Sequence, residues 1–166
     1  MDDLGEPEFK SSNLTAEITS ADLIGRWEIH SMEGDQEVNF NGDDVSSTDM
    51  LSETDCFDMM YYDFKENGNV RTGQAKLWFD NEGDFECYEG EYDATYSISG
   101  DILSVDFLLN GTPMTEEKQI SLTSDETGDY MHVTLSDWEA ATYVNDPGTT
   151  NASHLSLIEM TYKKIQ

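Results

Sequence analysis

The chain has 166 residues, 36 of them Asp or Glu and 8 Lys or Arg, which gives a formal net charge of -28 at pH 7. Such an acidic surface repels phosphate backbones and anionic lipid headgroups, so nucleic acid is excluded as a partner. The 37% of hydrophobic residues lie in alternating runs that support a fold, and no segment reaches the roughly 20 apolar residues of a transmembrane helix.

Residues 1–19 form a polar, acidic, turn-rich segment that we interpret as a flexible leader. It looks like the tether that remains when a processed secretory or lipoprotein signal is replaced by an initiator Met. A chain of this length is enough for one domain. We therefore expect a single domain over residues 20–166.

The domain begins with the segment TSADLIG, which predicts a short helical turn capped by Ser20. The pattern then changes to period two, and residues 24–32 form the first predicted strand, with Trp27 and Ile29 on one face. Residues 33–55 are a polar insertion without helical periodicity. Loops this long are usually functional.

From Cys56 onward, short alternating segments are separated by turn residues, and Asn67-Gly68 is a strong hairpin signal. Residues 136–139 match a capping box, so residues 137–144 are predicted either as a short helix or as a strand extension. The predicted strands are 24–32, 56–65, 69–79, 84–99, 102–109, 115–124, 130–136 and 154–164.

These eight strands follow one another through short turns, which is typical of an antiparallel all-β domain. Eight strands in up-and-down order can pair first with last, which removes exposed edges and leaves an interior for side chains or one small ligand. We predict a closed, eight-stranded up-and-down barrel.

The two cysteines, Cys56 and Cys87, lack the C-x-x-C spacing of redox and zinc sites. They form a disulfide if the protein is exported, or remain two buried thiols if it is cytosolic.

No nucleophile, base or metal cluster stands out in the sequence. The histidines His30, His132 and His154 are far apart, and neither H-E-x-x-H nor G-x-S-x-G occurs. Acid-rich turns invite a calcium hypothesis, but turn chemistry explains their Asp, Asn and Gly residues. We predict no catalytic residues, no metal site and no cofactor.

Aromatic side chains are the main lead toward a binding site, because ligand pockets combine apolar walls with a few polar groups. These side chains either line a lumen or fill a solid core. Strand parity does not decide between the two alternatives, because the segment "FDMMYYDF" is apolar on both faces. The aromatic candidates are Tyr61, Trp78, Tyr88, Tyr92, Tyr96, Phe107 and Trp138. For the ligand-binding set we choose Tyr61, Trp78, Tyr88, Tyr96, Phe107 and Met131.

Several motifs in a characteristic order resemble the lipocalin-like domains of small exported bacterial lipoproteins. They are Gly25-Arg26-Trp27 at the first strand, "YYDFKENGNV" at the second hairpin, "YSISGDILSVDF" in the middle and "MTYKK" in the last strand. The likeness spans roughly residues 22–164.

This resemblance implies a calycin barrel in a periplasmic, outer-membrane or secreted setting that binds a small molecule. It implies that Gly25 and Trp27 lie at the closed end, with a basic residue of the last strand, Lys163 or Lys164, over the indole. It also suggests a Cys56–Cys87 bridge. Second-neighbour strands are about 9–10 Å apart, beyond the roughly 7 Å limit of a disulfide, so Cys56 must lie in the lead-in to its strand.

Two functions follow as expectations. The first is a monomeric, non-catalytic carrier that holds a small, hydrophobic molecule. The second is a surface lipoprotein that uses the barrel as a scaffold and binds a protein or glycan through the 33–55 and 139–153 loops.

Overall fold

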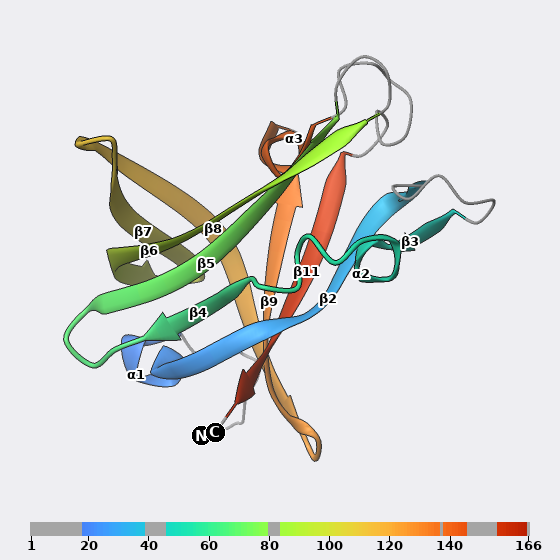
Figure 1. Ribbon diagram of the computed structural model, residues 1–166. Coiled ribbons are helices and arrows are strands. Elements are labelled where there is room, and N and C mark those ends of the chain that lie inside the picture. The colour runs from blue at the N-terminus through green and yellow to red at the C-terminus, as the bar shows by residue number, and fades with distance from the viewer. Residues whose placement is uncertain (1–17, 39–45, 80–83, 137, 146–155, 166) are drawn as a thin grey trace.

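The computed structural model describes residues 18–38, 46–79, 84–136, 138–145 and 156–165 (Figure 1). Within these ranges the helices are α1 (Ser20–Leu23), α2 (Met50–Glu53) and α3 (Trp138–Tyr143). The strands are β2 (Gly25–Val38), β3 (Ser47–Asp49), β4 (Tyr61–Phe64), β5 (Asn69–Phe79), β6 (Phe85–Ser99), β7 (Ile102–Leu109), β8 (Thr112–Asp125), β9 (Gly128–Ser136), β10 (Val144–Asn145) and β11 (Leu157–Ile165).

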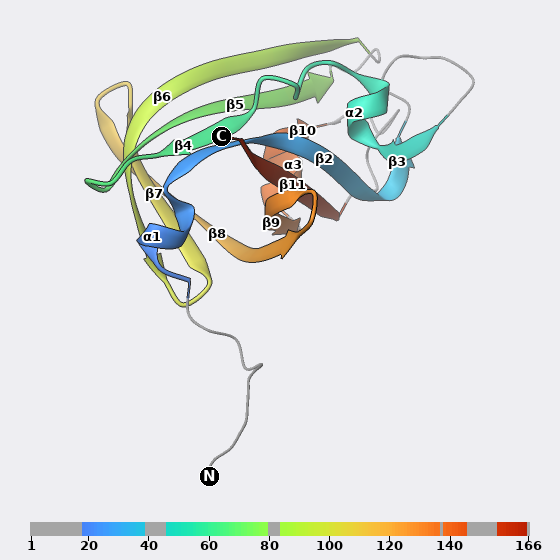
Figure 2. The same ribbon diagram turned by 90° about the horizontal axis from the view of Figure 1, so that it is seen from below.

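Eight of these strands form a closed antiparallel barrel in the order β2-β4-β5-β6-β7-β8-β9-β11. Each strand pairs with its neighbours in sequence, and β11 returns to pair with β2 between Ile158↔Gly34 and Ile165↔Arg26. The predicted all-β, eight-stranded up-and-down barrel is therefore confirmed. Figure 2 shows β5 and β6 arching over β8, β9 and β11, with α3 between the two sides.

The hairpin turns form where the sequence places turn residues. Gly68 adopts φ 84°, a conformation that side chains other than glycine rarely adopt, and it closes the β4–β5 turn as predicted. The turn before β8 is shorter than expected, and β8 begins at Thr112 rather than at residue 115. Its early part contains Pro113, which lies opposite Leu108 of β7.

The region predicted as a long polar loop contains more structure than expected. β2 continues to Val38, and β3 pairs with it through Glu33↔Asp49. Asp49 caps α2, since its carboxylate accepts the Leu51 backbone N–H at 3.1 Å. The few apolar residues of the insertion explain the order, because Val38 and Met50 are both buried. Residues 39–45 lie outside the described part of the chain.

The second predicted strand is shorter than expected, because residues 56–59 form turns and β4 begins at Tyr61. The Met60 backbone N–H bonds to the Phe57 carbonyl at 3.1 Å, and both side chains are buried. An apolar segment can be buried in turns as well as in a strand, and its composition does not distinguish the two. The sequence therefore predicted a longer strand.

Two short helices, α1 and α3, lie near opposite ends of the barrel (Figure 1). α1 is capped by Thr19 rather than Ser20, and Asp22 accepts the Thr19 backbone N–H at 2.9 Å. Residues 138–143 form helix α3, which decides between the two alternatives for this segment. After α3, β10 pairs in parallel with β5 through Val144↔Leu77. No helix among the described residues is long and apolar enough to cross a membrane.

Candidate functional site

The interior of the barrel receives alternate residues of each strand, because successive side chains of a strand point to opposite faces. Residues opposite one another in an antiparallel pair point to the same face. Thr72 of β5 lies opposite Tyr92 of β6. Val105 of β7 lies opposite Glu116 of β8. The interior therefore mixes apolar and polar side chains.

A chain of hydrogen bonds crosses this interior from α3 to β4. The Tyr143 hydroxyl donates to Gln74 Oε1 at 2.7 Å. Gln74 Nε2 donates to Thr72 Oγ1 at 2.7 Å, and the Thr72 hydroxyl donates to the Tyr61 carbonyl oxygen at 2.8 Å. Burial, with a smaller effect of Glu116, raises the pKa of Tyr143 far above its usual range, so its hydroxyl remains a donor.

An internal cavity of about 150 Å³ lies beside this chain. Part of its lining is apolar and the rest carries hydroxyl, amide and charged groups, a combination typical of small-molecule pockets. The apolar part consists of Tyr92, Ala94, Val105, Phe107 and Met114, and the polar part of Tyr62, Thr72, Gln74, Lys76, Glu116 and Tyr143.

The barrel wall opens between β6 and β7 next to this cavity. The two strands pair only from Thr95↔Asp106 to Ser99↔Ile102, so residues 85–94 of β6 have no β7 partner. Figure 1 shows β6 and the β7–β8 hairpin diverging beyond this point. A groove of about 900 Å³ lies at the opening. Groove and cavity adjoin each other, because they share the lining residues Tyr92, Ala94, Phe107 and Met114.

Apolar side chains are exposed where the groove meets solvent. Leu108 is 66% exposed, Met114 41% and Tyr92 36%. The rings of Tyr92 of β6 and Phe107 of β7 lie next to each other at the opening, tilted by 43° and with 6.0 Å between their centroids. A cluster of exposed apolar side chains around an opening is typical of a ligand-binding groove.

The end of the barrel next to α1 is closed around Trp27, whose side chain is 1% exposed. Its indole N–H donates to the Leu23 carbonyl oxygen of α1 at 2.8 Å. Lys164 lies over the indole, with Nζ 5.5 Å from the ring. Gly25 makes this approach possible, because a Cβ there would lie 2.9 Å from Lys164 Cε, and its φ of +124° disfavours other residues.

The cation over Trp27 is Lys164 and not Lys163. Trp27 pairs with Lys164 across β2 and β11, whereas Lys163 pairs with Glu28. Neighbouring strand residues point to opposite faces. Lys163 thus lies outside the barrel, 5.9 Å from the Tyr130 ring.

The two cysteines form a disulfide, with their Cα atoms 5.7 Å apart. Cys87 is in β6, and Cys56 lies in the turns that lead into β4. The predicted bridge and the predicted position of Cys56 are both confirmed. The disulfide attaches this lead-in segment to the strand that forms one side of the opening.

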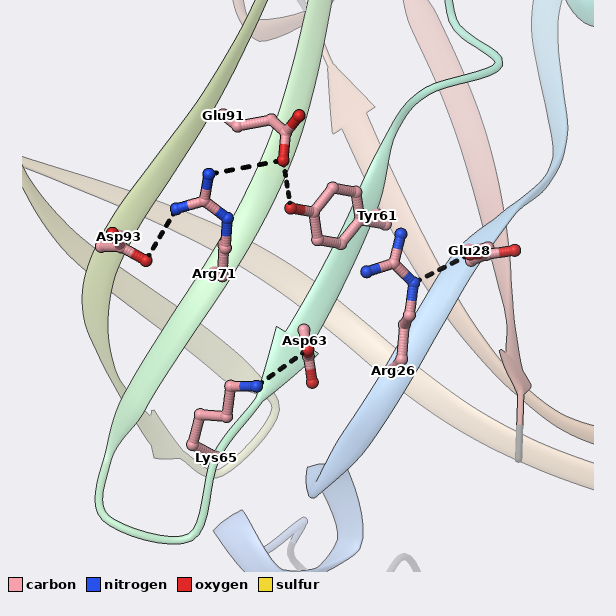
Figure 3. Close-up of polar contacts among 8 residues, drawn as sticks. All are labelled: Arg26, Glu28, Tyr61, Asp63, Lys65, Arg71, Glu91 and Asp93. Carbon is pink, nitrogen blue, oxygen red and sulfur yellow. Dashed lines mark hydrogen bonds and ion pairs between the residues drawn. The ribbon is translucent and has the colours of Figure 1, made fainter.

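Tyr61, predicted to line the lumen, lies instead on the outer face of the barrel (Figure 3). It lies opposite Gly73, and the Arg26 guanidinium covers its ring at 3.9 Å from the centroid. Its hydroxyl donates to Glu91 at 2.7 Å, and Glu91 also pairs with Arg71 at 3.5 Å. The arginine and the glycine explain why Tyr61 is buried although it is outside.

Of the six predicted ligand-binding residues, all of which the structure describes, Phe107 lines both the cavity and the groove and the other five line neither. Trp78 and Tyr88 are 44% and 50% exposed and contact each other at 5.5 Å. Both side chains are on the face of their strand that lines the cavity, but they lie farther along the strand than the cavity extends. Tyr96 and Met131 are part of the packed core.

Sequence reasoning missed most of the cavity. It considered Tyr92 only among the general aromatic candidates, and it did not consider Gln74, Lys118 or Tyr143. For Lys118 a signal was available, because it shares the parity of Ile120 and Leu122 in an otherwise alternating strand. Tyr143 carried no such signal, because its position depends on how α3 packs.

Each of the two described histidines contacts a side chain of another strand. His30 contacts the Tyr130 ring at 5.4 Å, and His132 bonds to Thr123 at 2.8 Å. His154 lies outside the described residues. Within the described ranges, no group of three or more His, Cys, Asp or Glu residues is placed to hold a metal ion.

Comparison with known proteins identifies the family. A family model described as a lipocalin-like domain matches residues 23–127, more than half of the chain. The match runs from β2 to β8 and includes the cavity lining except Tyr143. No curated protein and no solved structure matches the chain. The chain therefore belongs to the lipocalin-like domain family.

Proposed function

We propose that this barrel binds a small molecule with an apolar body, which enters through the opening between β6 and β7. The observation that supports this most is that cavity and groove lie side by side and share the lining residues Tyr92, Ala94, Phe107 and Met114. The lipocalin-like fold is itself consistent with small-molecule binding.

The dimensions support a ligand that occupies both spaces. A cavity of about 150 Å³ holds about one benzene-sized ring. Ligand pockets usually measure about 300–1,000 Å³. A molecule of that size would extend from the cavity into the groove, where Leu108 and Met114 offer apolar surface.

Non-catalytic binding, export, lipid anchorage and a monomeric state belong to the same proposal. A disulfide such as Cys56–Cys87 is typical of oxidising compartments, which supports a location outside the cytoplasm. For binding through the 33–55 and 139–153 loops, the described residues add no observation that favours it; residues 39–45 and 146–155 lie outside the described part of the chain.

Nile red, a neutral apolar dye, tests the proposal through its fluorescence increase on binding. Met114→Trp adds bulk where groove and cavity meet, so we expect it to weaken dye binding about tenfold or more, which corresponds to ~1.4 kcal/mol. Thr134→Trp is the matched control, because Thr134 is exposed on β9 and lines neither space. Equal binding by both variants, or no binding by the unmodified protein, contradicts the proposal.

A further inference from the structure

One lysine lines the cavity and a second lies next to its lining, in a chain that has only 8 lysines and arginines and a net charge of -28. Lys76 of β5 lines the cavity directly. Lys118 of β8 adjoins it through Glu116 and Tyr143, both of which line the cavity. Two lysines against one glutamate leave this part of the interior with a net charge of +1.

Lys118 is buried without sufficient hydrogen bonding. Its side chain is 5% exposed, and its Nζ lies 4.0 Å from Glu116 Oε1, which is too far for a hydrogen bond. The centroid of the Tyr143 ring lies 5.0 Å from the same Nζ. The structure shows no hydrogen bond from this ammonium to a described residue. Because an ammonium has three donors and is costly to bury unpaired, it favours an acceptor that comes from outside the chain.

Lys76 also has no anionic partner among the described residues. It follows Gln74 at the same strand parity and lines the same cavity. Gln74 is itself occupied, because it accepts from Tyr143 and donates to Thr72. Among the described residues, Lys76 is therefore a cation in the cavity wall that has no anionic partner.

The groove outside has the opposite balance. Its lining includes Lys65 and Arg71 against Glu91, Asp93 and Asp106, a net charge of -1. Arg71 is already paired with Asp93 at 2.9 Å. An anionic group is thus favoured in the cavity and disfavoured in the groove, where the exposed apolar side chains suit the rest of a ligand.

We infer that Lys76 and Lys118 form an anion subsite and that the ligand is a small amphipathic carboxylate, whose carboxylate lies in the cavity and whose apolar body lies in the groove. This inference rests on the proposed function. A carboxylate supplies the acceptors that both ammonium groups lack, and charge-assisted hydrogen bonds are stronger than neutral ones.

Three probes with the same alkyl chain test the inference: octanoate, octanol and octylamine, each titrated calorimetrically at neutral pH. We expect octanoate to bind about tenfold tighter than octanol, equivalent to ~1.4 kcal/mol, and octylamine to bind most weakly. Lys76→Met should abolish the preference for octanoate while octanol binding remains. Lys76 is only partly buried and has no ion pair to orphan, so this variant should fold.

Lys163→Met is the charge-matched control, because Lys163 lies on the outer face over Tyr130. It should keep the preference for octanoate. If octanoate and octanol bind equally, or if Lys76→Met retains the preference, the anion subsite is wrong and the binding function stands. If none of the three probes binds and Nile red does not bind either, both the subsite and the proposed function are wrong.

Discussion

Trp27 at the closed end of the barrel offers the sharpest test of the packing described above. Replacing it with alanine should lower the free energy of unfolding by about 3–5 kcal/mol, the range for truncating a buried aromatic side chain. Trp27 is 1% exposed, and Trp27→Ala also leaves the Leu23 carbonyl without the indole donor that lies 2.8 Å away. Trp27→Phe keeps most of the packing but loses that hydrogen bond, so it should cost about 1–3 kcal/mol.

Urea unfolding followed by circular dichroism measures both losses. Trp78→Ala is the matched control, because Trp78 is 44% exposed, its indole N–H donates to the Thr142 carbonyl at 3.2 Å and its ring contacts the Tyr88 ring. This control should cost about 1 kcal/mol or less. If Trp27→Ala costs no more than Trp78→Ala, the indole does not hold the closed end and the reasoning is refuted.

Two further predictions concern the disulfide and the buried tyrosines. Cys56→Ser combined with Cys87→Ser opens a bridge between residues 31 apart in sequence, which should cost about 3–4 kcal/mol in the same urea assay; an unchanged urea midpoint would contradict this. Burial raises the pKa of Tyr143 and of Tyr162 far above their usual range. A raised folded-state pKa gives stability that is complete below the unfolded value of about 10 and lost as the pH rises above it. The urea midpoint should therefore fall as the pH rises from about 10 to about 11, and less steeply in Tyr143→Phe; equal slopes would show that Tyr143 contributes nothing to the fall.

The strands of the barrel could be predicted because their signals are local. Clean alternation, as in Leu103 and Val105 of β7, shows which face is buried, and Asn67-Gly68 marks where one strand turns into the next. Cys56 could be placed in the lead-in to β4 because a disulfide limits the distance between its ends.

The cavity could not be predicted in the same way, because it depends on where strands separate and on what covers them. Parity places Trp78 on the inner face of β5 but does not show that the strand continues past the cavity to an exposed position. Tyr61 has a buried side chain on the outer face, which alternation cannot distinguish from an inner position. Tyr143 reaches Gln74 from a helix that lies 69 residues away in sequence.

The opening between β6 and β7 has one well-anchored side and one weakly anchored side. β6 pairs with β5 along residues 85–95. The disulfide also joins Cys87 of β6 to Cys56 in the segment before β4. Among the described residues, the β7–β8 hairpin beyond Asp106 pairs only with itself, because β8 pairs with β9 only from Gln119 onward. A segment held by so few neighbours opens at lower free energy than the wall that it faces. We therefore expect any change in the width of the entrance to come from bending of this hairpin rather than from the cavity wall on β5 and β6.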